Sequence, residues 1–254
     1  MSTRPLPPLL SAVELHAIRD RPDLRILDAT TLFRLDTEQE RYVAAPAREA
    51  YLAEHIPGAV HVDVVHALSD PDAEWDFTLP SPERFARQVG ALGVGNDTHV
   101  VVYDPDDPWA TRVWWLLRVF GLDTVSVLDG GLRAWREAGL PTESGPVQPT
   151  PAVFTPRFRP ELVARTDEVE KLSTGGGRLV NALDPATFRG EQPVNPYPRR
   201  GRIPGSVNLP FHTLLDPATG RFRPRAELAG PLEQAGLLGP GRAVTYCGGG
   251  IAAT

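Results

Sequence analysis

One pattern of residues occurs twice in this 254-residue chain, and the repetition constrains the fold more than any other feature. The stretch AEHIPGAVHVDV at residues 53–64 is matched by RGRIPGSVNLPF at 200–211, and THVVVYD at 98–104 is matched by RAVTYC at 242–247. Two further pairs, 24–31 with 177–184 and 82–95 with 225–239, keep the same order. We infer a tandem repeat of one structural unit, in preference to two unrelated halves.

The repeated unit has the pattern of alternating strands and helices. Short apolar runs bounded by polar residues predict strands at residues 24–30, 59–63, 98–104 and 124–131. Amphipathic or apolar stretches predict helices at residues 12–20, 81–94, 109–122 and 132–139, the first two beginning at the cap candidates Ser11 and Ser81. This alternation predicts an α/β fold in which a mainly parallel sheet is flanked by helices.

A proline-rich stretch separates the two repeats. Residues 141–160, PTESGPVQPTPAVFTPRFRP, show no hydrophobic periodicity and are expected to form an extended linker. The two domains are therefore expected at residues 1–140 and 161–254. About 36 residues of the first domain follow Asp104, but seven residues follow Cys247 at the matching place. We therefore expect the second domain to be truncated at its C-terminus, without a final helix, strand and helix.

Charge and hydropathy exclude several classes of function. The net charge of −6 disfavours binding to nucleic acid or to an anionic membrane surface, which both require clustered positive charge. No stretch approaches the ~20 apolar residues of a membrane span. The N-terminal sequence MSTRPLPPLLSAVEL lacks the long apolar core and cleavage site of a signal peptide. We expect a cytoplasmic protein with no nucleic-acid or membrane partner.

The sequence predicts neither a metal site nor a cofactor. Its one cysteine, Cys247, can form neither an internal disulfide nor a cysteine-cluster metal site. The acidic run DPDDP at residues 104–108 has no histidine or backbone pattern that supports a metal, so we expect a solvated loop there.

The surroundings of Cys247 are typical of a reactive thiol. It follows a predicted strand and precedes Gly248, Gly249 and Gly250 on a turn that is expected to open a helix. Glycines allow the backbone to curl and aim several N–H groups at one point, and a helix start adds positive potential. Both effects favour the thiolate, which is the nucleophilic form of cysteine. From the loop alone, a buried and inert cysteine stays open as the alternative.

Taken together, these motifs resemble the tandem-domain rhodanese family of sulfurtransferases, which includes thiosulfate and 3-mercaptopyruvate sulfurtransferases. The resemblance runs from about Leu15 to Thr254 and rests on HIPGAVHVD, VVVYD, VLDGGLRAW, FRGE, PRRGRIPGSVNLPF and VTYCGGGIAAT. It implies two tandem rhodanese-like domains, the first a non-catalytic copy with Asp104 at the nucleophile position. It also implies that Cys247 of the second domain accepts a sulfane sulfur and becomes a persulfide.

The resemblance implies a small anionic sulfur donor and a thiophilic acceptor such as cyanide, a thiol or a thioredoxin-like protein. The donor would lie against the loop residues Gly248, Gly249, Gly250, Ile251 and Ala252. This neutral loop is more similar to the mercaptopyruvate type than to the basic loops of many thiosulfate-specific members. Gly249 and Ala252 nevertheless stand where that type carries hydroxyl residues, so the donor stays open between thiosulfate and 3-mercaptopyruvate.

A loop-cysteine phosphatase is a poorer match. Such enzymes need an arginine six residues after the cysteine to clamp phosphate, and this chain has Ala253 there. The alternative from another functional class is a non-catalytic rhodanese-like binding module or an inactive truncated fragment.

Three arginines and one histidine are further candidates by resemblance. Arg189 and Arg199 match the family's Phe/Tyr-Arg-Gly and Pro-Arg-x-Gly positions, which contact the substrate. Arg200 is added because Thr187 stands where the family often has another substrate-binding arginine. His55 matches a position with a proton-transfer role in mercaptopyruvate enzymes, although the simpler interpretation is that it hydrogen-bonds a turn.

Overall fold

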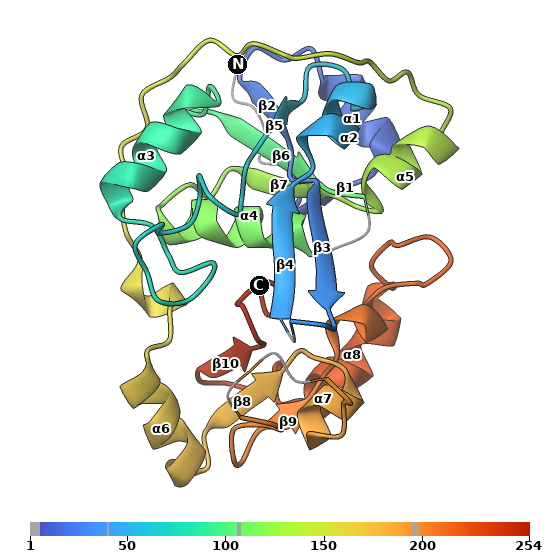
Figure 1. The fold of residues 1–254 in the computed structure, drawn as a ribbon. Coiled ribbons are helices and arrows are strands. Elements are labelled where there is room, and N and C mark those ends of the chain that lie inside the picture. Colours follow the sequence, from blue (N-terminus) through green and yellow to red (C-terminus); the bar gives the residue numbers. More distant parts are fainter. Residues whose placement is uncertain (1–5, 40, 106–107, 195–196, 198) are drawn as a thin grey trace.

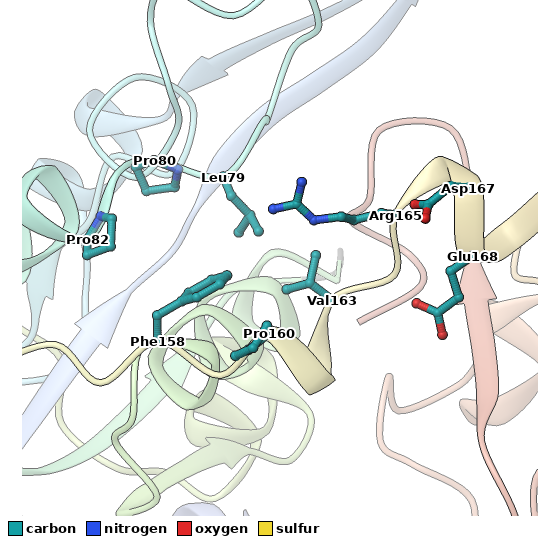
Figure 2. A pocket seen from close by; sticks show the side chains of 9 residues that line it. All are labelled: Leu79, Pro80, Pro82, Phe158, Pro160, Val163, Arg165, Asp167 and Glu168. Atoms are coloured by element: carbon teal, nitrogen blue, oxygen red, sulfur yellow. The ribbon is translucent and has the colours of Figure 1, made fainter.

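Two α/β units joined by an extended segment make up the computed structural model of this protein (Figure 1). The structure describes residues 6–39, 41–105, 108–194, 197 and 199–254. Within these residues, the first unit contains a five-stranded parallel sheet in the order β1-β7-β6-β2-β5. The strands are β1 (Leu9–Leu10), β2 (Leu24–Asp28), β5 (Val60–His61), β6 (His99–Tyr103) and β7 (Val125–Leu128).

Helices cover both faces of the first sheet. They are α1 (Ala12–Ile18), α2 (Arg48–Ala53), α3 (Pro82–Ala91), α4 (Trp109–Val119) and α5 (Gly131–Glu137). In β6, Val100 and Val102 share one core with α3 and α4, while Val101 and Tyr103 share the other with α1 and α5. This division follows from the alternation of side chains across a strand.

The predicted starts of two helices are confirmed. Ser11 and Glu14 form a reciprocal capping box at α1, and the Ser81 hydroxyl accepts from the Arg84 N–H at the start of α3. A side-chain oxygen at this place satisfies an N–H that has no partner within the helix. The local sequence therefore sets where both helices begin.

An antiparallel hairpin was not among the predicted elements. Its strands are β3 (Thr31–Asp36) and β4 (Arg41–Pro46), which pair Phe33 with Ala44. Figure 1 shows the hairpin leaving the first sheet and reaching the second unit. This connection brings residues of the first unit to the functional site described below.

Residues 141–160 form the predicted extended segment, but it is held against the first unit. The Ala152 N–H donates to the Gly90 carbonyl at 2.9 Å, and Thr155 exchanges two hydrogen bonds with the Asn96 side chain. A Cβ on Gly90 would lie 2.6 Å from the Ala152 carbonyl oxygen, so glycine is required for this close approach. The segment therefore behaves as a strap and not as a free linker.

The second unit repeats the central part of the first. Its elements are α6 (Thr166–Gly175), β8 (Arg178–Asn181), α7 (Pro185–Arg189), β9 (Val207–Asn208), the 3₁₀ turn η2 (Phe211–Leu214), α8 (Arg225–Gln234) and β10 (Ala243–Tyr246). A further 3₁₀ turn, η1 (Pro160–Leu162), precedes α6. The strand order β10-β8-β9 matches β6-β2-β5, and all pairs are parallel.

One hydrogen bond recurs at equivalent places in the two units. The Tyr103 hydroxyl accepts from the Ile56 N–H at 3.1 Å, and the Tyr246 hydroxyl accepts from the Ile203 N–H at 3.0 Å. In each unit this bond joins the end of the equivalent strand, β6 or β10, to the Ile-Pro-Gly turn. The repeated residues therefore perform the same structural task twice, which supports the predicted tandem architecture.

The units differ in extent among the described residues. Strand β10 lies at one edge of the second sheet, whereas its equivalent β6 is followed by α4, β7 and α5 and pairs with β7. A search of the described helices finds none with the length and hydropathy needed to cross a bilayer.

Candidate active site

Cys247 directly follows β10, at the carboxyl end of the second parallel sheet. Ligand sites in α/β folds form at this end of the strands. The half-buried Sγ accepts a hydrogen bond from the Gly250 N–H at 3.1 Å. Gly250 has a φ of 72°, a left-handed conformation that glycine adopts without strain and that turns its N–H back to the sulfur. A donor placed in this way stabilises a negatively charged sulfur.

The other two loop glycines permit close packing. A Cβ on Gly248 would lie 1.6 Å from the Tyr197 hydroxyl oxygen, and a Cβ on Gly249 would lie 2.8 Å from the Phe77 ring. We predicted that all three glycines aim N–H groups at the sulfur. The structure shows this contact for Gly250 and places aromatic rings against the other two glycines.

The loop continues into a turn at residues 251–254, the place where the predicted helix would begin. Thr254 N–H donates to the Ile251 carbonyl at 3.3 Å, and the Thr245 hydroxyl donates to the Ala253 carbonyl at 2.7 Å. A bond from residue i to i−3 makes a tight turn, while an α-helix needs bonds to i−4. Residues 251–254 therefore form a turn after the cysteine loop, and the helix expected to begin there stays a prediction.

The first unit has an aspartate side chain at the place that corresponds to the thiol. Asp104 follows β6, and its Oδ2 accepts from the Ala110 N–H at 2.7 Å. Nearby, Asp129 accepts a hydrogen bond from the Phe222 N–H of the second unit at 2.9 Å. Asp104 is therefore held within the first unit, while Asp129, which follows β7, forms a contact between the units.

Two cavities meet at Cys247. One has a volume of about 600 Å³ and the other about 140 Å³. Both are lined by Leu183, Tyr197, Cys247 and Gly248. The sulfur can therefore face two different bound molecules from one position.

The small cavity contains one of the three predicted arginines. It is lined in addition by Asn181, Thr187, Gln192, Arg199, Gly201 and Tyr246. Arg189 instead pairs with Glu191 at 2.8 Å, and Arg200 donates to the Gln192 and Pro193 carbonyls. Arg199 is thus the arginine that the structure brings beside the cysteine, while Arg189 and Arg200 line neither cavity.

The large cavity is lined by residues of both units and is rich in aromatic side chains. The hairpin and the loop at residues 74–77 contribute walls from the first unit, and η2 contributes Phe211 and His212 from the second. Seven of the described residues that line it are aromatic: Phe33, Tyr42, Trp75, Phe77, Trp109, Tyr197 and Phe211. The chain has five tryptophans, five tyrosines and nine phenylalanines, so a large share of its aromatic residues lies at this one site.

Arg112 of α4 brings a buried charge from the first unit to the cysteine loop. Its side chain donates to the Gly250 carbonyl at 3.0 Å and to the Phe77 carbonyl, and its guanidinium carbon lies 4.9 Å from the centre of the Trp115 ring. Burial lowers the pKa of Arg112 to about 10, against an opposing effect of Cys247. The guanidinium therefore stays positively charged at neutral pH and faces the loop that holds the sulfur.

Two tyrosines close the space between the hairpin and the loop. The rings of Tyr42 and Tyr197 lie 5.8 Å apart, and their hydroxyls are hydrogen-bonded. Burial raises the pKa of both phenols, and the negative charge of Cys247 raises it further. Both side chains are therefore neutral at physiological pH.

His55 has a structural position away from the cysteine. Its fully buried ring lies with Nδ1 2.8 Å from the Tyr51 carbonyl and Nε2 3.2 Å from Glu143 Oε1. It lines neither cavity at Cys247. The structure supports the simpler interpretation, in which His55 joins the turn after α2 to the strap.

The part of the chain that the structure describes offers no group of three or more His, Cys, Asp or Glu side chains able to hold a metal ion. Asp106 and Asp107, within the predicted solvated loop, lie outside the described residues.

The chain matches known proteins over most of its length. The family profile described as "Rhodanese-like domain" matches residues 11–138. The 3-mercaptopyruvate sulfurtransferase of Escherichia coli (strain K12) is 35% identical over 237 residues, which are 92% of this chain and 81% of that protein. The chain belongs to the rhodanese family. Thiosulfate sulfurtransferase of Bos taurus is 40% identical over 200 residues, 76% of this chain, and the match covers 64% of that protein, somewhat less than two thirds.

The rhodanese fold is also shown by a solved structure. The crystal structure of SseA from Escherichia coli, described as a 3-mercaptopyruvate sulfotransferase, has a TM-score of 0.83 and 33% identity. The match covers 98% of this chain and 91% of that one. The α/β architecture with two tandem rhodanese-like domains is therefore confirmed.

The first domain contributes side chains to this site that the sequence motifs did not predict. Arg41, Tyr42 and Arg112 come from that domain, and no motif marked them. A signal for Arg112 did exist, because it lies in the strongly apolar stretch WATRVWWLLRV. An arginine on a buried helix face needs a polar partner, which here is the cysteine loop.

Proposed function

We propose that this rhodanese is a sulfurtransferase that carries sulfane sulfur as a persulfide on Cys247. The observation that carries the proposal is the place of this thiol, where two cavities meet and the Gly250 N–H contacts the sulfur. The names of the relatives, thiosulfate and 3-mercaptopyruvate sulfurtransferase, support it.

The loading step transfers one sulfur atom to Cys247. The thiolate attacks the outer sulfur of thiosulfate, the sulfur–sulfur bond breaks, and its electron pair leaves with sulfite. With 3-mercaptopyruvate, the thiolate attacks the substrate sulfur and the carbon–sulfur bond breaks. Pyruvate then leaves as its enolate and takes up the proton that the substrate thiol releases. Either route forms the same persulfide anion.

The small cavity is suited to the donor. Both donors are small anions, and Arg199 offers a guanidinium in a space of about 140 Å³ beside the sulfur. The buried charge of Arg112 stabilises the persulfide anion from the other side of the loop. The loop itself carries no basic residue from Gly248 to Thr254. The loop therefore cannot neutralise both negative charges of thiosulfate. We expect a higher kcat/KM for the monoanionic 3-mercaptopyruvate than for thiosulfate.

The transfer step returns the enzyme to its starting state. A nucleophilic acceptor attacks the outer sulfur of the persulfide, the sulfur–sulfur bond breaks, and the electron pair returns to Cys247 as thiolate. With cyanide the product is thiocyanate, and with a thiol it is the acceptor persulfide.

Thiocyanate formation from each donor and cyanide tests the proposal. Intact-mass analysis after donor treatment should show the mass of one added sulfur atom, and Cys247→Ser should abolish both signals. A folded protein that forms no thiocyanate and gains no sulfur with either donor would contradict the proposal.

A further inference from the structure

We propose that the large cavity is the acceptor site and that it selects thiols with a cationic group on an apolar body. This inference rests on the proposed function and adds to it the chemical class of the acceptor. It also gives the non-catalytic first domain a direct role, because about half of the described residues that line the cavity belong to that domain.

The two cavities differ in size and lining in a way that separates donor from acceptor. The small cavity has Arg199 and room for a small anion. The large one, about 600 Å³, has the volume of sites that hold drug-sized ligands and is far larger than cyanide needs. Because both reach the same sulfur, one can load the persulfide and the other can unload it.

Aromatic rings form a continuous wall across the large cavity. Phe33 stacks on Tyr42 with ring centres 4.9 Å apart, and Trp109 meets Phe33 and Phe77 edge-on at 5.9 Å and 5.4 Å. Phe33 and Trp75 leave 42% and 62% of their surface exposed. An exposed apolar surface next to a reactive sulfur indicates that a bound molecule covers it.

One residue of this wall, Phe77, has a strained backbone conformation. Phe77 has a φ of 59°, a left-handed conformation that a bulky side chain rarely adopts. Its carbonyl accepts a hydrogen bond from the buried Arg112, which also contacts the cysteine loop. Strain of this kind persists where surrounding contacts impose it, and here it places a ring at the cavity.

The charges of the lining favour a cation. Glu74 and Asp76 flank Trp75 along the chain, and Asp184 of the second unit also lines the cavity. The carboxylates outnumber Arg41, the arginine in the described lining, and the persulfide adds further negative charge. Aromatic faces beside carboxylates are a favourable environment for ammonium groups.

Three thiols of similar size but different charge test this selectivity. Thiocholine is cationic, 2-mercaptoethanol is neutral and 2-mercaptoethanesulfonate is anionic. The protein is loaded with sulfur, and the rate of persulfide loss to each thiol is divided by the concentration of its thiolate. We expect thiocholine to exceed 2-mercaptoethanesulfonate by about tenfold, since a favourable cation–π and charge contribution of ~1.4 kcal/mol corresponds to that ratio.

Variants of the wall separate binding from the intrinsic reactivity of the thiols. Glu74→Gln with Asp76→Asn should reduce the thiocholine to 2-mercaptoethanesulfonate ratio about fivefold. Trp75→Ala should lower the ratio of thiocholine to cyanide turnover by a similar factor. Leu32→Ala is the control, because Leu32 is 63% exposed on the β3–β4 hairpin, which contributes Phe33 and Tyr42 to the wall, but Leu32 itself does not line the cavity. All four side chains are exposed, so these variants are expected to fold.

The outcomes distinguish this inference from the proposed function. Active transfer to cyanide with equal corrected rates for the three thiols would overturn the acceptor assignment and leave the sulfurtransferase intact. A ratio unchanged in the Glu74/Asp76 double variant would also overturn it. Failure to load sulfur at all would instead contradict the proposed function.

Discussion

At the scale of single residues, Arg112 places a buried positive charge next to the cysteine loop. Its charge is buried, and it donates to the Gly250 and Phe77 carbonyls on two separate loops. We expect Arg112→Met to lower kcat for sulfur transfer about tenfold, because the loop loses its partner and the persulfide loses a nearby charge. Arg112→Lys should recover part of this loss, since it keeps the charge.

The matched control for this prediction is Arg118→Met. Arg118 lies on the same helix and packs over Trp114 at 4.8 Å, but it lines neither cavity. Steady-state kinetics and circular dichroism of all three variants provide the measurement. An equal loss of kcat in Arg118→Met would show that the helix matters as a whole and that Arg112 has no special role.

A second residue-scale prediction concerns the donor. Arg199→Ala should raise the KM for 3-mercaptopyruvate and thiosulfate about tenfold, the effect of losing one charge-assisted hydrogen bond. Arg189→Ala should leave KM near its original value, because Arg189 pairs with Glu191 outside both cavities. Initial-rate measurements with each donor give the KM of both variants and of the original protein. Equal increases in the two variants would show that the arginines act together in solution.

At the scale of elements, the strap gives a prediction about stability. An alanine in place of a helical glycine ordinarily stabilises a protein by up to ~1 kcal/mol. At Gly90 of α3 the added Cβ would meet the Ala152 carbonyl at 2.6 Å, so we expect Gly90→Ala to destabilise the fold by about 1–3 kcal/mol. Gly175→Ala on α6, where the space is open, should instead stabilise it by about 0.5 kcal/mol. Urea denaturation gives the sign of each change.

Elements with strong local signals were predictable, and the hairpin was not. The strands around β6 and the capped helices α1 and α3 follow from apolar runs and from Ser11 and Ser81. The hairpin strand β3 instead has exposed apolar residues such as Leu32 and Phe33. Its faces do not separate into buried and exposed, so periodicity gives no strand signal there. What the hairpin packs against depends on the other unit.

At the scale of the whole molecule, the turn after β7 of the first domain forms a contact with the second domain. The Asp129 carboxylate accepts from the Phe222 N–H of the second domain, and Arg133 donates to the Ala218 carbonyl. We expect Asp129→Ala to speed amide hydrogen exchange at Phe222 about fivefold, which corresponds to the loss of ~1 kcal/mol. Asp129→Asn keeps an oxygen acceptor and should exchange nearly as slowly as the original protein. Unaltered exchange in the alanine variant would argue against this contact in solution.

The sequence by itself determined the α/β class, the tandem repeat and the place of the one cysteine after a strand. These properties depend on residues close together along the chain, such as the apolar run and glycines around Cys247. The tertiary structure decided which side chains meet that cysteine. It selected Arg199 over Arg189 and Arg200, and it joined Arg112 to Gly250 across 138 positions. Contacts over such separations arise from the packing of one domain on the other. Local hydrophobic periodicity cannot predict them, because it depends on residues that are close together along the chain.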